Sequence, residues 1–134
     1  MEYFQIILLL FFHLIADFFF QTRSMGRKKG KNIYWLISHV LVYTIVMTLC
    51  WELFLGFFAK PFSTMFLFAF ITFSTHLITD YFTSKLSGYC YIKMLEDKKD
   101  AKKTDFYEWA FWLVIGFDQF IHATTLILTY KYLC

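Results

Sequence analysis

The sequence lacks the short motifs that identify most catalytic classes, and it has few cysteines and little proline. It contains no phosphate-binding glycine loop, nucleophile elbow or HExxH zinc motif, which excludes the enzymes that depend on them. The three cysteines, at positions 50, 90 and 134, are odd in number and have no metal-ligand spacing. We therefore expect reduced or buried thiols and no cysteine metal site. The one proline, Pro61, follows Lys60 and predicts a tight turn where a helix begins.

Apolar and aromatic residues make up an unusually large part of the chain. Hydrophobic residues account for 59% and aromatic residues for 24%, with 19 phenylalanines and a mean hydropathy of +0.53. Such values lie far outside the range of soluble proteins. At 134 residues, the chain has room for four membrane spans of about 20 residues each and for no second domain. The sequence therefore predicts an all-α polytopic membrane protein, a four-transmembrane-helix bundle formed by one domain, residues 1–134.

Four apolar stretches are long enough to cross about 30 Å of hydrocarbon at about 1.5 Å per helical residue. They are Tyr3–Gln21, Ile33–Phe58, Phe62–Lys85 and Phe106–Tyr130. The first stretch differs from a signal peptide because Glu2 replaces the usual basic start, His13 and Asp17 lie inside it, and no small-residue cleavage site follows. We expect it to remain in the mature protein as the first span.

Basic residues are concentrated in two of the three connections. Thr22–Asn32 and Leu86–Asp105, with Lys85 added, hold eleven of the thirteen lysines and arginines. Because positive charge favours the cytoplasmic side, both connections are predicted there, and both termini are predicted on the far side of the inner (cytoplasmic) membrane. The same rule explains the basic loop Thr22–Asn32 without a nucleic acid. The expected partners are therefore the lipid bilayer and its anionic headgroups.

Every histidine of the chain lies in an apolar stretch, and three of the four have an aspartate four residues away. The pairs and the remaining histidine are His13-x-x-x-Asp17, His76-x-x-x-Asp80, Asp118-x-x-x-His122 and His39. In the first and third spans the histidine comes first, whereas in the fourth span, which runs the opposite way, the aspartate comes first. The aspartates are therefore predicted in a layer nearer the cytoplasm, with their histidines about 6 Å above it. His39 falls near the aspartate layer, with Tyr43 one turn above.

An ionisable side chain at membrane depth is costly, so it indicates function by default. Imidazole and carboxylate together favour zinc, manganese or iron(II), and seven such groups exceed the three or four that one zinc takes. We therefore expect one or two divalent transition metal ions per chain. The predicted metal ligands are His13, Asp17, His39, His76, Asp80, Asp118 and His122.

Two metals in such a site would activate a water and clamp the substrate. The predicted catalytic carboxylates are Asp17, Asp80 and Asp118, one of them free to act as general base. Polar residues nearby are predicted to steady the ligands or to contact substrate, and these are Gln21, Arg23, Tyr43 and Gln119.

Parts of this pattern are also similar to a known family. Three segments resemble the bacterial family known as domain of unknown function 3307: the run His13 to Gln21 (HLIADFFFQ), His76-x-x-x-Asp80 and Asp118-Gln119-x-x-His122. The resemblance covers nearly the whole chain and implies no activity. It implies a lysine soon after the third-span aspartate, and here Lys85 stands five residues after Asp80. A more remote likeness, in small polytopic size and intramembrane His/Asp motifs, is to the inner-membrane metal-dependent hydrolases of the LexA-binding type.

The leading prediction is a membrane-embedded metal-dependent hydrolase whose site opens to the cytoplasmic half of the bilayer. Its expected substrate is lipid-linked or membrane-proximal, such as a phosphoester. The alternative is a small transporter or channel for divalent metal or protons, which four short helices could form only as a homo-oligomer. A third reading is a regulatory membrane subunit in which the same site is structural. The apolar outer halves Ile6–Phe12 and Leu126–Leu128 predict closure on that side and favour the hydrolase.

Overall fold

The fold is built of helices in the part of the chain that the computed structural model describes, which is residues 3–54, 61–96 and 100–133. The elements are α1 (Tyr3–Leu14), the π-helix η1 (Ile15–Phe19), α2 (Arg23–Lys28), α3 (Ile33–Phe54), α4 (Phe62–Glu96) and α5 (Ala101–Leu133). The all-α prediction is confirmed over these ranges. Glu2, Lys60, Cys134 and the end of the predicted second span, 55–58, lie outside the described residues.

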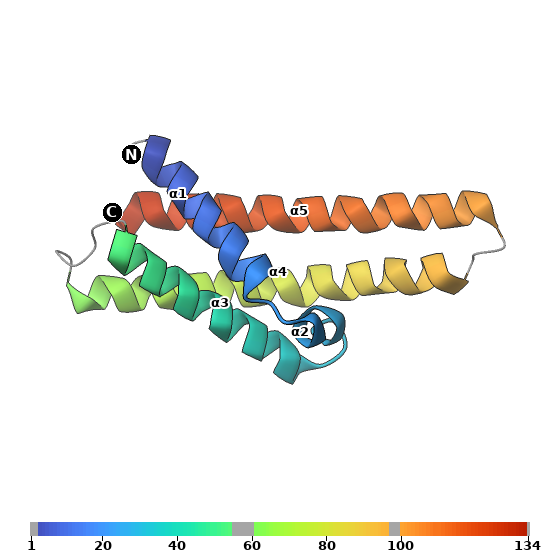
Figure 1. Ribbon diagram of the computed structural model, residues 1–134, viewed down its shortest axis with the longest axis horizontal. Coiled ribbons are helices and arrows are strands. Elements are labelled where there is room, and N and C mark those ends of the chain that lie inside the picture. Colours follow the sequence, from blue (N-terminus) through green and yellow to red (C-terminus); the bar gives the residue numbers. More distant parts are fainter. Residues whose placement is uncertain (1–2, 55–60, 97–99, 134) are drawn as a thin grey trace.

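The helices α4 and α5 form a long antiparallel pair that runs along the long axis of the molecule (Figure 1). They contain 35 and 33 residues. At about 1.5 Å per residue each is about 50 Å long, well beyond the hydrocarbon thickness of about 30 Å. α3 packs against α4, and α1 packs against both α3 and α5. The start of α1 and the end of α5 lie at one end of the molecule, whereas the end of α4 and the start of α5 lie at the other (Figure 1).

The connection expected at Leu86–Asp105 is largely helical. α4 continues to Glu96 and α5 begins at Ala101, with residues 97–99 outside the described part. Hydropathy marks where a helix leaves the hydrocarbon, but lysine and glutamate are good helix formers in water. Lys93 and Glu96, for example, form an ion pair of 2.8 Å one turn apart. The two helices therefore project beyond the point where hydropathy ends their spans.

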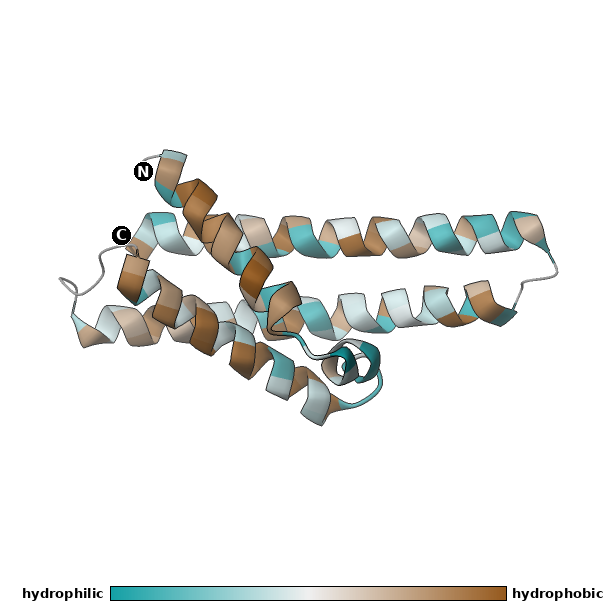
Figure 2. Ribbon diagram, viewed as in Figure 1, coloured by the Kyte–Doolittle hydropathy of each residue, from teal (hydrophilic) through white to brown (hydrophobic). Residues whose placement is uncertain are grey.

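Three helices of the described chain, α3, α4 and α5, are long and apolar enough to cross a membrane, and α1 with η1 forms a shorter apolar segment, Tyr3–Phe19. Outward positions are apolar: Phe66, Phe70 and Phe120 are 65%, 59% and 66% exposed. The polar side chains of α4 at positions 72, 76, 80 and 87 are buried. In Figure 2 strongly hydrophobic colours run along α1 and α3, and α2 is hydrophilic. Exposed apolar faces around a polar interior are the arrangement of a helical bundle in a membrane.

An apolar core fills the end of the bundle where α1 starts and α5 ends. Its buried members are Leu9, Phe12, Ala16, Tyr43, Met47, Trp51, Phe68, Leu126 and Tyr130. In a membrane such a core is held by van der Waals packing, because lipid tails are as apolar as leucine. Cys90 is buried and Cys50 half-buried, and both are free thiols, as expected. The core closes one side of the polar interior.

The segment between η1 and α3 is ordered by local caps. Oγ1 of Thr22 accepts a hydrogen bond from the backbone N–H of Met25 at 3.2 Å, which starts α2. Oδ1 of Asn32 accepts from the backbone N–H of Tyr34 at 2.9 Å, at the start of α3. Pro61 directly precedes α4, as proline at a helix start predicts. Because α2 also packs against α3, the basic connection is a structured element beside the bundle.

Candidate metal centre

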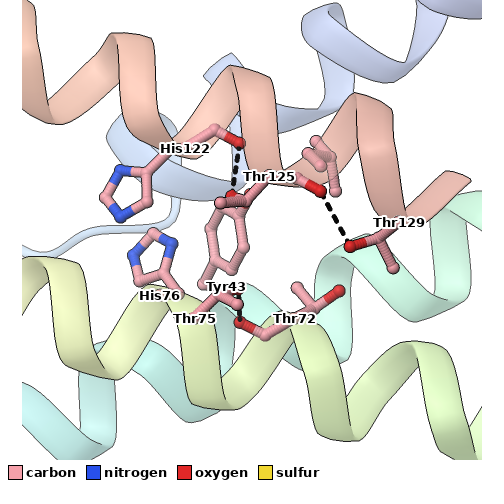
Figure 3. A pocket seen from close by; sticks show the side chains of 8 residues that line it. Tyr43, Thr72, Thr75, His76, His122, Thr125 and Thr129 are labelled. Carbon is pink, nitrogen blue, oxygen red and sulfur yellow. Dashed lines mark hydrogen bonds between the residues drawn. The ribbon is translucent and has the colours of Figure 1, made fainter.

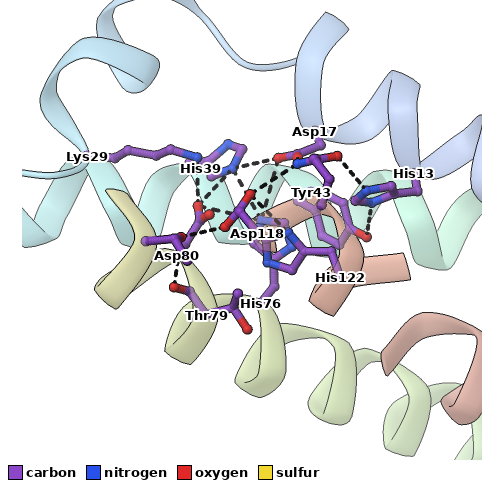
Figure 4. A network of polar contacts seen from close by, with 12 residues as sticks. His13, Asp17, Lys29, His39, Tyr43, His76, Thr79, Asp80, Asp118 and His122 are labelled. Carbon is purple, nitrogen blue, oxygen red and sulfur yellow. Dashed lines mark hydrogen bonds and ion pairs between the residues drawn. The ribbon is translucent and has the colours of Figure 1, made fainter. Parts of the chain in front are cut away.

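The seven histidines and aspartates of the apolar stretches meet in one buried group, which we call the His/Asp cluster. The cluster consists of His13, Asp17, His39, His76, Asp80, Asp118 and His122. Each of these residues is at most 7% exposed, and they come from α1, η1, α3, α4 and α5. Figure 4 shows their side chains directed toward one another between the helices. The spacing of four residues puts both members of each pair on one helix face, which explains why they meet.

His39 lies at the centre of the cluster. Its Nε2 is 3.1 Å from Oδ1 of Asp17, 3.2 Å from Oδ2 of Asp80 and 3.3 Å from Nε2 of His76. Nε2 of His76 is 3.7 and 3.6 Å from the same two carboxylate oxygens. Ligand atoms about 2.0–2.1 Å from a tetrahedral zinc ion lie about 3.3 Å from one another. The two imidazoles with either carboxylate are therefore spaced like three ligands of one small divalent cation.

A second group of potential ligands lies around His122. Asp17, Asp118 and His122 each offer one ligand atom, and these three atoms lie within 4.8 Å of one another. The rings of His76 and His122 are stacked, with centroids 4.0 Å apart. Both ring nitrogens of His122 are buried and have no hydrogen-bond partner in the described chain. Nδ1 is 3.4 Å from Oδ2 of Asp118. Buried nitrogens of this kind can serve as ligands, so His122 and the two aspartates form a second group of potential ligands beside the first.

The cluster carries more negative than fixed positive charge. Within residues 3–54, 61–96 and 100–133, Lys29 is the one lysine or arginine that reaches it, with Nζ 2.8 Å from Oδ2 of Asp80. Three carboxylates less this one cation leave two negative charges when the histidines are neutral. A charge at membrane depth costs about 3 kcal/mol, so the two need a counter-charge. One divalent metal ion would supply it, and protonation of two histidines would do the same.

Lys29 reaches the cluster from the segment after α2 because the neighbouring glycine allows a close approach. A Cβ atom at Gly30 would lie 2.6 Å from the carbonyl oxygen of Ser84 on α4, so no larger residue fits without a shift of backbone. Lys29 was not predicted as a site residue, because the positive-inside rule already explains the basic loop. The signal that could have indicated it is that three buried aspartates need a nearby cation. Lys85, the lysine that the family resemblance implied after Asp80, is exposed. Its Nζ lies 3.7 Å from the ring centroid of Tyr81.

Asp17 lies in a single π-helical turn that the sequence did not predict. The backbone N–H of Phe20 donates to the carbonyl of Ile15 at 3.1 Å, which is an i to i+5 hydrogen bond. Ala16 and Asp17 are both buried. π-helical turns are rare and occur frequently at functional sites. Here the turn carries the Asp17 carboxylate that lies beside His39.

His13 is held by two neutral side chains at the edge of the cluster. Its Nδ1 lies 2.8 Å from Oη of Tyr43, and its Nε2 lies 3.1 Å from Oε1 of Gln119. Because Oε1 of Gln119 can only accept, Nε2 carries the proton and donates it, and Nδ1 accepts from the Tyr43 hydroxyl. The amide nitrogen of Gln119 also donates to Asp17 at 2.7 Å and to Asp118 at 3.1 Å. Both ring nitrogens of His13 are therefore engaged with neutral side chains, and His13 is not among the His/Asp groups whose ligand atoms lie within 4.8 Å of one another in the described chain. Its role as a metal ligand stays a prediction.

A cleft of about 850 Å³ leads away from the carboxylates of the cluster. Its inner end is lined by Asp17, Asp80, Asp118 and Gln119. Gln21 also lines it, whereas Arg23, which was predicted to contact substrate, is exposed and lies outside the lining. Arg27, one turn further along α2, lines the cleft instead. Sites for small molecules commonly measure about 300–1,000 Å³, so the cleft has the size of a ligand site.

A much smaller cavity, of about 10 Å³, lies on the other side of the histidines (Figure 3). It is lined by Tyr43, Thr72, Thr75, His76, His122, Thr125, Leu126 and Thr129. Such a volume holds about one water molecule. Tyr43 and Leu126 belong both to this lining and to the apolar core. The polar interior is therefore wide toward the cleft and ends in a water-sized space toward the core.

Comparison with known proteins identifies a family but no activity. The sequence profile of the family described as Protein of unknown function (DUF3307) matches residues 5–134. No curated protein and no solved structure matches the chain. The remote likeness to inner-membrane metal-dependent hydrolases therefore stays a hypothesis. Because the match includes the entire His/Asp cluster and nearly every residue, the chain belongs to the DUF3307 family.

Proposed function

We propose that this protein is a membrane-embedded metal-dependent hydrolase that acts on a lipid-linked or membrane-proximal substrate. The observation that carries the proposal is the position of the His/Asp cluster at the inner end of a cleft of about 850 Å³. The same three aspartates belong to groups of atoms spaced like the ligands of a divalent cation and also line a cleft large enough for a substrate. A hydrolase needs this combination, because its metal and its substrate must be adjacent.

The chemistry of the cluster favours zinc, manganese or iron(II), with one or two ions per chain. The first ion would be held by His39, His76 and either Asp17 or Asp80. The second would be held by Asp118 and His122, with Asp17 shared. A metal bound there would supply an activated water and positive charge for the oxygens of the substrate.

The remaining side chains fix the carboxylates and move protons. Lys29 holds Asp80. Thr83 and Gln119 hold Asp118, with Oγ1 of Thr83 2.5 Å from Oδ1 of the carboxylate. A carboxylate that is not bound to metal accepts the proton of the attacking water, as a general base does. The apolar core keeps water from entering on the opposite side.

We further propose four membrane spans, with both termini outside the cytoplasm and the cleft open to the cytoplasmic half of the inner membrane. The first span would be Tyr3–Phe19, an apolar segment of 17 residues that lies at the short end of the range for a transmembrane helix. Basic residues support the orientation, because they gather on the segments that form the cleft end. They include Arg27, Lys28, Lys31, Lys85 and Lys93.

A carrier for protons or divalent metal is the second candidate. The water-sized cavity favours it, because four threonines extend the polar lining past His76 and His122. A carrier needs access from both faces in turn. The apolar core occupies the face opposite the cleft, so we place the hydrolase first.

The proposal is tested with the purified chain in detergent, loaded in turn with zinc, manganese and iron(II) and incubated with membrane lipid extract. We expect a water-soluble phosphate product that depends on the metal. Asp17→Asn should lower the rate by on the order of 100-fold, because it removes a ligand or base without changing shape. Asp105→Asn, an exposed residue of α5, is the matched control and should keep the rate. Flux of metal or protons into proteoliposomes without any hydrolytic product would place the carrier first.

A further inference from the structure

The cleft has a basic wall that the hydrolytic chemistry does not use. Arg27, Lys31 and Lys85 line it, and in the described part of the chain none of them pairs with a carboxylate. The acidic residues of the lining are the three aspartates of the His/Asp cluster, at the inner end. Negative groups therefore lie where a metal would bind, and positive groups without a carboxylate partner line the rest of the cleft.

The same cleft has an apolar wall, formed largely by α4 and α5. It includes Phe18, Ile92, Leu95, Phe111 and Ile115. Phe18, Ile92 and Leu95 are 49%, 37% and 42% exposed, so the apolar lining continues onto the outer surface of the helices. A ligand with a hydrocarbon chain can therefore keep that chain on apolar surface while its polar end lies in the cleft.

We propose that the cleft binds a lipid with a phosphate headgroup and that such lipids are the substrate class of the site. Arginine holds phosphate oxygens in a bidentate manner and lysine adds a point charge, which suits Arg27, Lys31 and Lys85 to the headgroup. A free phosphate ion would leave the apolar wall and most of about 850 Å³ unused. The lipid is therefore favoured over the free ion. The assignment as substrate rests on the proposed function, whereas binding of the lipid does not.

The reaction of such a substrate is a hydrolysis that needs no further reactant. The oxygen of a water molecule forms a bond to phosphorus while the ester bond between phosphorus and the lipid oxygen breaks. The proton that the water loses passes by way of a carboxylate to the departing oxygen, so the products are a lipid alcohol and phosphate.

Binding is tested with the full chain in neutral detergent containing EDTA, with bound lipid counted by native mass spectrometry. The probes are dioctanoyl phosphatidic acid, dioctanoyl phosphatidylcholine and inorganic phosphate. We expect saturable binding of phosphatidic acid. Phosphatidylcholine should bind about tenfold more weakly, because its choline masks the headgroup charge. Inorganic phosphate at the same concentration should not displace the phosphatidic acid.

Two charge variants locate the binding. They are Arg27→Gln/Lys31→Gln/Lys85→Gln, the cleft triple, and Lys93→Gln/Lys102→Gln/Lys103→Gln, the control triple. The cleft triple should weaken binding of phosphatidic acid by about tenfold or more. The control triple removes the same charge from the same end of the molecule but outside the lining, so it should change binding by less than about twofold. The charge-preserving variant Arg27→Lys/Lys31→Arg/Lys85→Arg should bind and so controls for folding.

Three results would overturn the proposal. They are a folded chain that binds no phosphatidic acid, an equal loss in both triples, and displacement by inorganic phosphate at equal concentration, which would assign the basic wall to a free anion. The zinc content of the same chain, loaded without EDTA, separates this proposal from the proposed function. If the chain takes up zinc but no phosphatidic acid, the metal site is supported and the lipid proposal is refuted. If it binds phosphatidic acid but no zinc, the lipid proposal is supported and the proposed hydrolase is refuted.

Discussion

Nζ of Lys29 lies 2.8 Å from Oδ2 of Asp80, although the two residues are 51 positions apart and on different sides of α3 in the sequence. The pair joins the segment after α2 to the polar interior of α4. It also sets the charge of the His/Asp cluster, because Lys29 offsets one of three carboxylates. The basic connection is therefore part of the candidate metal centre.

Lys29→Met should destabilise the fold by about 3 kcal/mol, because it leaves the Asp80 carboxylate buried without its partner. Thermal unfolding in detergent measures the loss. Lys31→Met, an exposed neighbour, should change stability by less than about 0.5 kcal/mol. The double variant Lys29→Met/Asp80→Asn should recover most of the loss, since it removes the unpaired charge. Equal effects of Lys29→Met and Lys31→Met would show that the pair contributes nothing.

Gly30→Ala should lower the melting temperature and separate Lys29 from Asp80. Its Cβ would lie 2.6 Å from the backbone oxygen of Ser84, so the backbone must move. Gly88→Ala is the matched control, because a Cβ there meets nothing within 4 Å. Gly88→Ala should be neutral or stabilising by up to about 1 kcal/mol, as alanine is the better helix former. Equal melting temperatures of the two variants would contradict the close approach.

Gln119→Leu should weaken metal binding by about 10–100-fold without changing the number of ions bound at saturation. The reason is that Gln119 contacts His13, Asp17 and Asp118 together and fixes their orientation. Equilibrium competition with a chromogenic chelator gives the affinity. Gln21→Leu is the control, since Oε1 of Gln21 has no hydrogen-bond partner in the described chain. An unchanged affinity in Gln119→Leu would remove the orienting role.

The proposed topology predicts that a reporter fused after the C-terminal residue is outside the cytoplasm. A reporter inserted between Glu96 and Asp100 should be inside, because the basic residues lie at that end. Paired phosphatase and fluorescent-protein fusions give opposite signals on the two sides. If the C-terminal fusion reports a cytoplasmic location, the orientation is the reverse of the proposed one and the cleft lies on the outer side of the membrane.

The grouping of histidines and aspartates could be predicted because helix geometry is fixed. Four residues make about one turn, so the reversed order of His76 and Asp80 against Asp118 and His122 in antiparallel helices puts like groups at one depth. The extent of α4 could not be predicted in this way, since hydropathy reports the solvent around a helix and not its end.

Two features of the site depend on packing that no local pattern encodes. Lys29 is placed by the contact of Gly30 with the backbone of α4, and contacts between segments so far apart in sequence leave no periodic signal. The π-helical turn Ile15–Phe19 is apolar apart from Asp17, and its sequence would suit an α-helix equally well. Both features sit beside the aspartates, which is where departures from regular helix geometry are expected at a functional site.

The most direct test of the central claim, that the His/Asp cluster is a metal site, is the metal content of the purified chain. Protein prepared in metal-free detergent is exposed to zinc, manganese and iron(II), and bound metal is measured by elemental analysis. We predict one or two ions per chain; the ion held by His39 and His76 should be lost in His39→Ala/His76→Ala, and the full content should be kept in the exposed control Asp105→Asn/Glu108→Gln. A folded chain that retains none of the three metals would contradict the claim, and protonated histidines would then balance the two uncompensated carboxylates.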